Sequence, residues 1–233
     1  VYRDEKSLEA ASWYLKTLSE VGIEAEALTG SAVEAMEPAL KPGVVGGFLN
    51  PGDACLRPDR YVAELARLVR ARGGQIEEEV RVDSLVHERG RLTSVQTNVG
   101  TWRPRDVVFA LGAWSPLLSK SIGVRLPIQP GKGYSITYSR PHPCPRIPLT
   151  LKEASVCVTA WNSGFRLGST MEFAGYDSSL NPTRLDALRR AAAIYLKDPE
   201  GAQTLEEWYG WRPMTADDLP IIGPVPGIGN MCL

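Results

Sequence analysis

The feature that most constrains the fold is a continuous apolar run at residues 106–112 (DVVFALG), which passes directly into residues 113–118 (AWSPLL). An unbroken apolar run that ends in glycine is typical of a strand buried on both faces. Ser115 and Pro116 then suit the N-cap and the first turn of a helix. The run therefore predicts a buried strand, a turn and a helix, the unit from which α/β domains are built.

The residues that follow have a different pattern, with short segments typical of antiparallel strands. We expect these strands at residues 134–138, 149–151, 156–160 and 165–170. One helix interrupts the pattern, and Asn181 and Pro182 open it. Its buried side is predicted to carry Leu185, Leu188, Ala192 and Leu196.

The beginning of the chain is predicted to be mainly helical. A helix over residues 7–21, ended by Gly22, is indicated by apolar residues at helical spacing: Leu8, Ala11, Leu15 and Leu18. Residues 31–34 (SAVE) match a capping box in which Ser31 opens a short helix, and that helix must end before Pro38. Residues 43–53 are expected to form a loop or a short strand.

A further helix is expected from Arg57, with Pro58 in its first turn and Gly73 at its end. Its apolar residues are expected on one face, formed by Val62, Leu65, Ala66 and Val69. Two strands at residues 76–86 and 92–97 should then form a half-exposed antiparallel ribbon around a turn at residues 88–90.

Composition and charge exclude several function classes. With 233 residues, 43% hydrophobic and 23% charged, the chain can bury one large core or two small ones. Its formal net charge is −1 and no block of like charges occurs, so we expect no nucleic-acid partner. The apolar runs are shorter than the ~18 residues of a membrane span.

The residue types of common catalytic and metal sites are scattered. No CxxC spacing occurs among the four cysteines, which argues against zinc and a disulfide framework and favours a reducing cytoplasm; they are Cys55, Cys144, Cys157 and Cys232. We expect no metal site. His87 and His142 are expected on the surface, and Asp217 and Asp218 are expected to form a turn.

Residues 208–224 (WYGWRPMTADDLPIIGP) are the most informative for function because they place one arginine between aromatic rings and a Pro/Gly-rich run. A guanidinium offers a planar fork of donors that fits a carboxylate in two parallel hydrogen bonds. Arg212 is therefore a candidate for binding an amino acid or another small acid. The alternative is a structural arginine stacked on Trp208 or Trp211.

Five segments occur in an order that resembles the FAD-dependent D-amino-acid oxidase and dehydrogenase family, in particular its dehydrogenase branch. They are residues 46–53 (GGFLNPGD), the helix beginning at Arg57, residues 110–115 (ALGAWS), residues 127–134 (PIQPGKGY) and residues 211–224. The resemblance covers essentially the whole chain. No single segment is highly specific, but the occurrence of all five in this order is strong evidence for the resemblance.

The resemblance implies FAD as the cofactor and identifies three residues that would contact it. Val82 matches a position whose backbone contacts the adenine. Gly112 and Trp114 match a turn that lies against the dinucleotide, where a missing side chain lets the backbone approach closely. Without the resemblance, the three residues are interpreted as a core valine, a turn glycine and a packing tryptophan.

The resemblance also implies a substrate site. Arg212 matches the arginine that binds the substrate carboxylate, and Tyr134 or Trp208 would cover the pocket for the substrate side chain. The family's Gly-rich turn, which seats the pyrophosphate at a helix N-terminus, is absent: no GxGxxG occurs, and residues 227–229 (GIG) are only a fragment. A later flavin-binding segment is absent as well. The sequence resembles the interior of a flavoenzyme, and we expect the isolated 233 residues to be inactive.

The predicted fold class is α+β, with part of an α/β FAD-binding domain and an antiparallel substrate domain of the D-amino-acid oxidase type. Residues 51–124 and 212–233 are assigned to the FAD-binding part, and residues 1–50 and 125–211 to the substrate domain.

The function implied is FAD-dependent oxidative deamination of an amino acid by hydride transfer from the α carbon to the flavin, as part of a longer enzyme. The electron acceptor, oxygen or a quinone of an electron-transfer chain, stays open. One alternative is an oxidase of glycine, sarcosine or another amine. Another is a non-catalytic binding or assembly module that has lost the nucleotide-binding segment. A cytoplasmic location is expected, with peripheral attachment to the inner face of the membrane left open.

Overall fold

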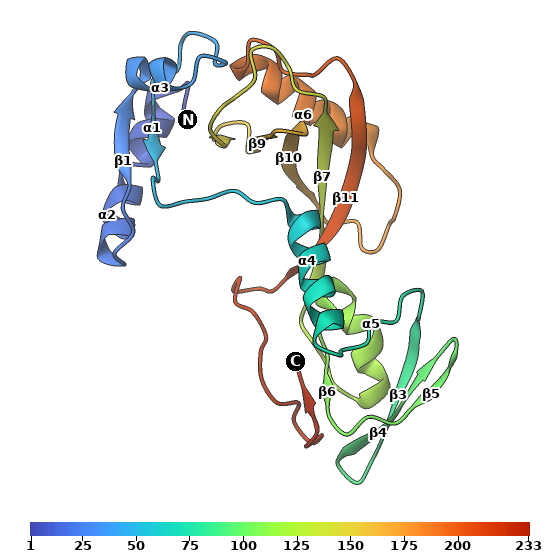
Figure 1. Cartoon of the computed structure of the whole chain (residues 1–233). Helices are drawn as coiled ribbons and strands as arrows, with labels where there is room; N and C mark the ends of the chain where they lie inside the picture. The colour runs from blue at the N-terminus through green and yellow to red at the C-terminus, as the bar shows by residue number, and fades with distance from the viewer. The chain divides into compact units, whose positions relative to one another are not determined.

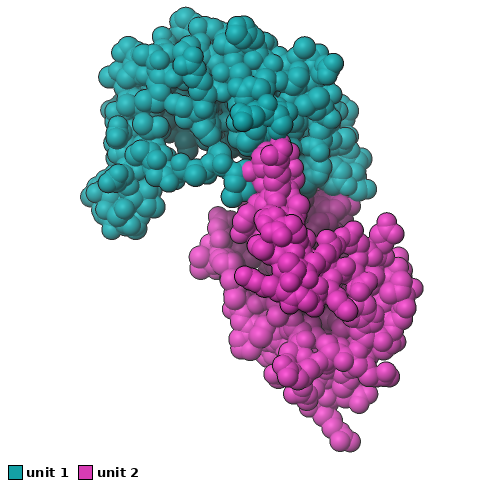
Figure 2. Space-filling model, viewed as in Figure 1, with its two compact units in different colours: residues 1–56, 133–172, 178–210 teal, residues 57–132, 173–177, 211–233 magenta.

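The computed structural model describes residues 1–233, which form two compact units (Figure 1 and Figure 2). Unit 1 contains residues 1–56, 133–172 and 178–210. Unit 2 contains residues 57–132, 173–177 and 211–233. Each unit has its own hydrophobic core.

Unit 1 is built on a five-stranded sheet with the strand order β11-β7-β10-β9-β8. Its strands are β7 (Gln129–Tyr138), β8 (Leu149–Leu151), β9 (Val156–Trp161), β10 (Gly164–Glu172) and β11 (Thr204–Met214). The pairs β8·β9 and β9·β10 are antiparallel, as predicted. The first residues of β7 and the last residues of β11 belong to unit 2.

Helix α6 (Pro182–Tyr195) packs against β8, β9 and β10 (Figure 1). The Asn181 side chain caps it by accepting a hydrogen bond from the Thr183 backbone N–H. The predicted buried side is confirmed, because each of its four residues is at most 3% exposed: Leu185, Leu188, Ala192 and Leu196. Local sequence and tertiary packing therefore agree in this helix.

The N-terminal part of unit 1 contains five short elements. They are α1 (Glu5–Ala10), α2 (Trp13–Glu20), β1 (Glu26–Thr29), α3 (Gly30–Met36) and β2 (Gly46–Leu49). The prediction of one helix over residues 7–21 is wrong, since the helix breaks at Ala11 and Ser12. No residue of α2 is buried, so packing does not hold the two pieces in one continuous helix.

The cap of α3 also differs from the prediction. Thr29, in an extended conformation, caps the helix by accepting a hydrogen bond from the Ala32 N–H at 3.3 Å. Ser31 already lies inside the first turn, because the helix begins at Gly30. The expected end before Pro38 is confirmed, and β2 is the short strand expected within residues 43–53.

Unit 2 begins with α4 (Pro58–Ala71), which starts and ends where the sequence indicated. Its apolar face, however, is not buried: Val62 is 62% exposed, Leu65 44% and Val69 45%. The apolar face identified from the sequence is therefore present, but it is uncovered in these 233 residues. Periodicity identifies an amphipathic helix correctly, but it does not say which surface the helix covers.

A three-stranded antiparallel sheet follows, formed by β3 (Val82–Glu88), β4 (Arg91–Thr97) and β5 (Gly100–Trp102). The predicted ribbon is thus present, but the first strand does not include residues 76–81. Glu79 has a φ of 59°, a left-handed conformation that is incompatible with an extended strand.

The run at residues 106–112 forms only a short strand, β6 (Val107–Val108), which pairs in parallel with β12 (Met231–Cys232). It is buried on one side only, because Val108 is 75% exposed while Phe109 is 6% exposed. The prediction of a strand buried on both faces is therefore wrong in this structure. The turn that follows is the 3₁₀ helix η1 (Gly112–Trp114), and α5 (Ser115–Ser119) begins directly after it.

Candidate active site

Three aromatic residues of unit 2 form a cluster that joins separate stretches of the chain. The Trp211 ring meets the Trp114 ring edge to face at 5.4 Å and the Tyr176 ring at 5.8 Å. The Tyr176 hydroxyl donates a hydrogen bond to the Ala113 carbonyl oxygen at 2.7 Å. Burial raises the pKa of Tyr176, so this hydroxyl remains a donor at neutral pH. We call Trp114, Tyr176 and Trp211 the aromatic cluster.

A cavity of about 690 Å³ in unit 1 and one of about 400 Å³ in unit 2 are the candidate ligand-binding spaces. The unit 2 cavity is lined by Gly112, by residues 213–215 and by several apolar side chains, including Phe109 and Leu126. Gly112 has a φ of 54° and nothing of the protein within 4 Å of where a Cβ would lie. The positive φ explains why a glycine occupies position 112, and the space beside it is open to a ligand.

Arg212 lies in β11 directly between Trp211 and the residues that line the unit 2 cavity. Its side chain is exposed and forms no ion pair or hydrogen bond with the protein. Trp211 itself packs against the rings of Trp114 and Tyr176. The guanidinium is available for an anionic ligand.

The other two predicted substrate residues belong to unit 1. Trp208 is 53% exposed, and its ring lies over Gly210, where an added Cβ would fall 2.3 Å from the ring. Tyr134 is 2% exposed in the core, and its hydroxyl donates to the Glu172 carboxylate. Trp208 therefore presents a free aromatic surface, whereas Tyr134 contributes mainly to packing.

The predicted cofactor residues all lie in unit 2, at two places. Gly112 and Trp114 are the first and last residues of η1, and Trp114 is 48% exposed. Val82 is the first residue of β3 and packs against the core of the unit. The structure brings Gly112 and Trp114 together with the neighbours of Arg212; their contact with a cofactor stays a prediction.

Sequence reasoning missed a buried ion pair beside the aromatic cluster. Lys132 is fully buried, and its ammonium lies 3.6 Å from the Asp177 carboxylate, which is 51% exposed. A buried lysine normally keeps a charged partner because an unpaired ammonium is costly to desolvate. The only signal in the sequence was the position of Lys132 between two glycines.

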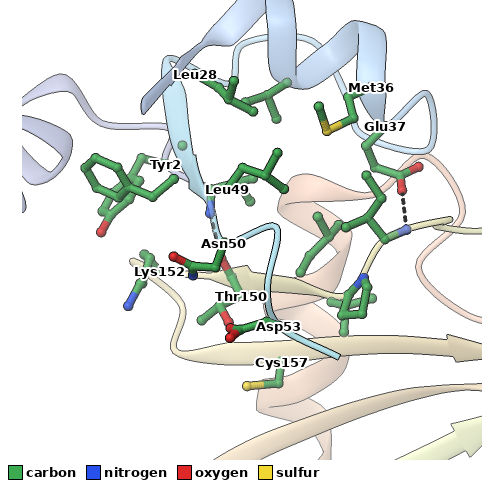
Figure 3. Close-up of a pocket in the computed structure, with 18 of the residues that line it drawn as sticks. Tyr2, Leu28, Met36, Glu37, Leu49, Asn50, Asp53, Thr150, Lys152 and Cys157 are labelled. Carbon is green, nitrogen blue, oxygen red and sulfur yellow. Dashed lines mark hydrogen bonds between the residues drawn. The ribbon is translucent and has the colours of Figure 1, made fainter. Parts of the chain in front are cut away.

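The unit 1 cavity was not predicted either, and it contains none of the predicted site residues. Figure 3 shows polar side chains on one side of it, among them Asn50, Asp53 and Lys152, and apolar Leu28 and Met36 on the other. Asn50 donates to the Tyr14 hydroxyl at 3.2 Å. The Lys152 ammonium lies 5.9 Å from the centre of the Tyr14 ring.

One carboxylate of this cavity is committed to the fold. Glu37 is 2% exposed and accepts hydrogen bonds from the backbone N–H groups of Ala39, Arg146 and Ile147 (Figure 3 draws one of them). Three donors to one buried carboxylate fix the loop at residues 146–147 to α3. Glu37 is thus occupied in positioning backbone and is not a free acid or base.

Asp218 lines the unit 2 cavity, whereas the two histidines and Asp217 do not line either cavity. His87 and His142 are exposed, and Asp217 accepts from the Leu219 N–H in the expected turn. No three His, Cys, Asp or Glu side chains are placed to hold a metal ion. The two longest helices, α4 and α6, have 14 residues each, and none of the helices is both long and apolar enough to cross a membrane.

Comparisons with known proteins identify the family of the chain. The family model described as "FAD dependent oxidoreductase" matches residues 1–233. A D-amino acid dehydrogenase of Paramagnetospirillum magneticum is 32% identical over 231 residues, covering 97% of this chain and 55% of the relative. A glycine oxidase of Pseudomonas putida is 33% identical over 201 residues, covering 84% and 54%. The chain thus spans about half the length of these relatives.

Solved structures show the same fold. Glycine oxidase from Geobacillus kaustophilus superimposes with a TM-score of 0.91 at 24% identity, covering all of this chain and 62% of that protein. L-proline dehydrogenase from P. horikoshii superimposes with a TM-score of 0.83 at 18% identity, covering all of this chain and 64% of that protein. The predicted α+β fold of the D-amino-acid oxidase type is therefore confirmed.

Proposed function

Because the chain belongs to the FAD dependent oxidoreductase family, we propose that it is the substrate-binding part, and a portion of the FAD-binding part, of an enzyme that deaminates an amino acid oxidatively. The observation that carries this proposal is the free guanidinium of Arg212 beside residues that line the unit 2 cavity. Arg212 precedes these lining residues in the chain; an exposed, unpaired arginine suits the carboxylate of a ligand, and a largely apolar cavity suits a small organic body.

We assign the two units different tasks. Unit 1, with its antiparallel sheet, would form the substrate domain, and unit 2, with its parallel pair β6·β12, would form part of the FAD-binding domain. These units differ from the predicted ranges at residues 51–56, which lie in unit 1, and at residues 125–132, 173–177 and 211, which lie in unit 2.

The residues of unit 2 fit a flavin dinucleotide in two respects. The open space at Gly112 lets a planar group approach the backbone of η1, and the apolar lining of the cavity suits an aromatic ring system. Gly112 and Trp114 would contact the dinucleotide, and the backbone at Val82 would contact the adenine. When bound, FAD supplies the oxidant that accepts a hydride from the substrate α carbon.

The protein's own part in the reaction is to bind and orient the substrate. Arg212 would hold the carboxylate in two parallel hydrogen bonds, which fixes the direction of the α C–H bond. Trp208 would cover the substrate side chain with its exposed ring. The substrate amine must be neutral at this moment, since its lone pair forms the C=N bond as the hydride leaves. Water then hydrolyses the imino acid to a 2-oxo acid and ammonia.

Relatives named D-amino acid dehydrogenase and glycine oxidase both match the chain, so two substrate classes are supported. We propose D-amino acids first, because several of the similar relatives carry that name. Glycine or a secondary amine such as sarcosine is the second candidate. For the electron acceptor we propose a quinone of an electron-transfer chain, with oxygen as the alternative.

Steady-state turnover by the FAD-bound enzyme that contains this chain tests the proposal. We expect D-alanine to be oxidised at least about tenfold faster than L-alanine in kcat/KM, with a quinone analogue as the better acceptor. Free FAD at the same concentration is the control. Higher activity on glycine or sarcosine with release of hydrogen peroxide would favour the amine-oxidase alternative. Absence of turnover with every amine and acceptor would favour a non-catalytic module.

A further inference from the structure

We propose that Tyr176 is a positioning residue that aligns the carboxylate-binding arginine with the turn at residues 112–114, a role that rests on the proposed function. Tyr176 belongs to a short stretch, residues 173–177, that enters unit 2 between β10 and α6. The sequence gives no reason to single it out. Its contacts in the structure do.

Tyr176 contacts both parts of the candidate site within unit 2. Its hydroxyl donates to the Ala113 carbonyl oxygen, in the middle of η1, at 2.7 Å. Its ring packs edge to face on Trp211, the residue before Arg212, at 5.8 Å and 68°. Trp211 in turn packs on Trp114, the last residue of η1. One side chain therefore connects the η1 backbone with the strand that carries Arg212.

The stretch itself is anchored on its other side. Asp177, the next residue, pairs with the fully buried Lys132 at 3.6 Å. An ion pair to a fully buried ammonium restrains the residue that follows Tyr176, and with it where Tyr176 can lie. The ion pair, the hydroxyl hydrogen bond and the edge-to-face rings thus fix Tyr176 from three directions.

Such an arrangement matters for a reaction that depends on orientation. A ligand carboxylate on Arg212 and a group lying against Gly112 must keep a fixed separation, and small displacements of either are costly in rate. Ala113 is 1% exposed and offers its carbonyl oxygen to Tyr176, so removing the hydroxyl leaves a buried acceptor unsatisfied. The expected response is a shift of η1 relative to Trp211.

The test compares Tyr176→Phe with wild type in the FAD-bound enzyme, using an amino acid and its decarboxylated amine as substrates. Tyr176→Phe keeps the ring and removes only the hydrogen bond. We expect kcat/KM for the amino acid to fall about 2- to 10-fold, the effect of one neutral hydrogen bond, with a smaller fall for the amine. The affinity for FAD should weaken to a similar degree, because η1 loses its support.

Tyr61→Phe is the matched control, since Tyr61 is 54% exposed on α4 and its hydroxyl has no partner. Tyr61→Phe should leave unchanged both the ratio of kcat/KM between the two substrates and the affinity for FAD. Lys132→Met should reproduce the pattern of Tyr176→Phe through loss of the anchor. If Tyr176→Phe lowers only the melting temperature and leaves both the FAD affinity and the ratio of the two substrates at wild-type values, Tyr176 is a packing residue and the inference is wrong.

The FAD measurement separates this inference from the proposed function. If wild type binds FAD but oxidises no amine, the proposed function fails, and FAD affinity in Tyr176→Phe still decides whether Tyr176 supports η1. An unchanged affinity in that case would overturn the inference as well.

Discussion

Replacing Arg212 by alanine in the FAD-bound enzyme is expected to lower kcat/KM for an amino acid by roughly 30-fold to several thousand-fold. The physical reason is that the substrate carboxylate would lose a bidentate, charge-assisted partner. Leaving a desolvated charge unpaired costs about 2 to 5 kcal/mol, and ~1.4 kcal/mol corresponds to a factor of ten. Arg212 forms no bond within the protein, so the substitution should leave stability nearly unchanged.

Three comparisons make this prediction specific. Arg212→Lys should recover only part of the activity, because an ammonium lacks the planar fork. Arg103→Ala, which removes an exposed and unpaired arginine from the same unit, is the control and should behave as wild type. The decarboxylated amine should lose much less activity than the amino acid. An equal loss for both substrates would mean that Arg212 supports the fold or the flavin and does not bind the carboxylate.

The second large effect concerns the cofactor: the 233 residues expressed alone are expected to retain no FAD after gel filtration. The cavity of about 400 Å³ in unit 2 accommodates only part of such a ligand. Helix α4 offers no glycine-rich, phosphate-binding N-terminus, since it begins with Pro58 and Asp59, and Asp59 is paired with Arg57. The parallel pair β6·β12 is also only two residues long.

Absorption spectra of the two polypeptides would check this prediction. The 233-residue chain should be colourless, whereas the family-length enzyme prepared in the same buffer should be yellow. A stoichiometric yellow chromophore on the isolated chain would show that our assignment of the cofactor contacts is wrong. Circular dichroism should be recorded alongside, so that loss of FAD can be distinguished from failure to fold.

The sequence predicted those elements of the fold whose partners are local. The α6 helix is the best example, because its start at Asn181 and Pro182 and its buried side were both predicted and both are confirmed. By contrast, the strand β6 was wrongly predicted to be buried on both faces, and the sequence did not show what the apolar face of α4 would cover. Periodicity shows that a surface is apolar, whereas what covers it depends on residues far away in the chain.

The candidate site shows the same limit. Arg212 was selected from its aromatic neighbours and from the family resemblance, and the structure leaves its side chain free. Tyr176 and the pair Lys132–Asp177 were missed, because each contact joins segments more than 30 residues apart and no spacing rule connects them. Tyr134 and Trp208 were both predicted to cover the substrate side chain because both are aromatic, yet Tyr134 is buried and Trp208 is exposed.

The most direct test of the account is to mix the FAD-bound enzyme with an amino acid in the absence of oxygen and record the visible absorption band of the flavin. Our account predicts that a D-amino acid bleaches the band in a single turnover, and that the Arg212→Ala enzyme, with FAD still bound, bleaches far more slowly. A wild-type flavin that chemical reductant bleaches but that no amino acid, glycine or sarcosine reduces would contradict it.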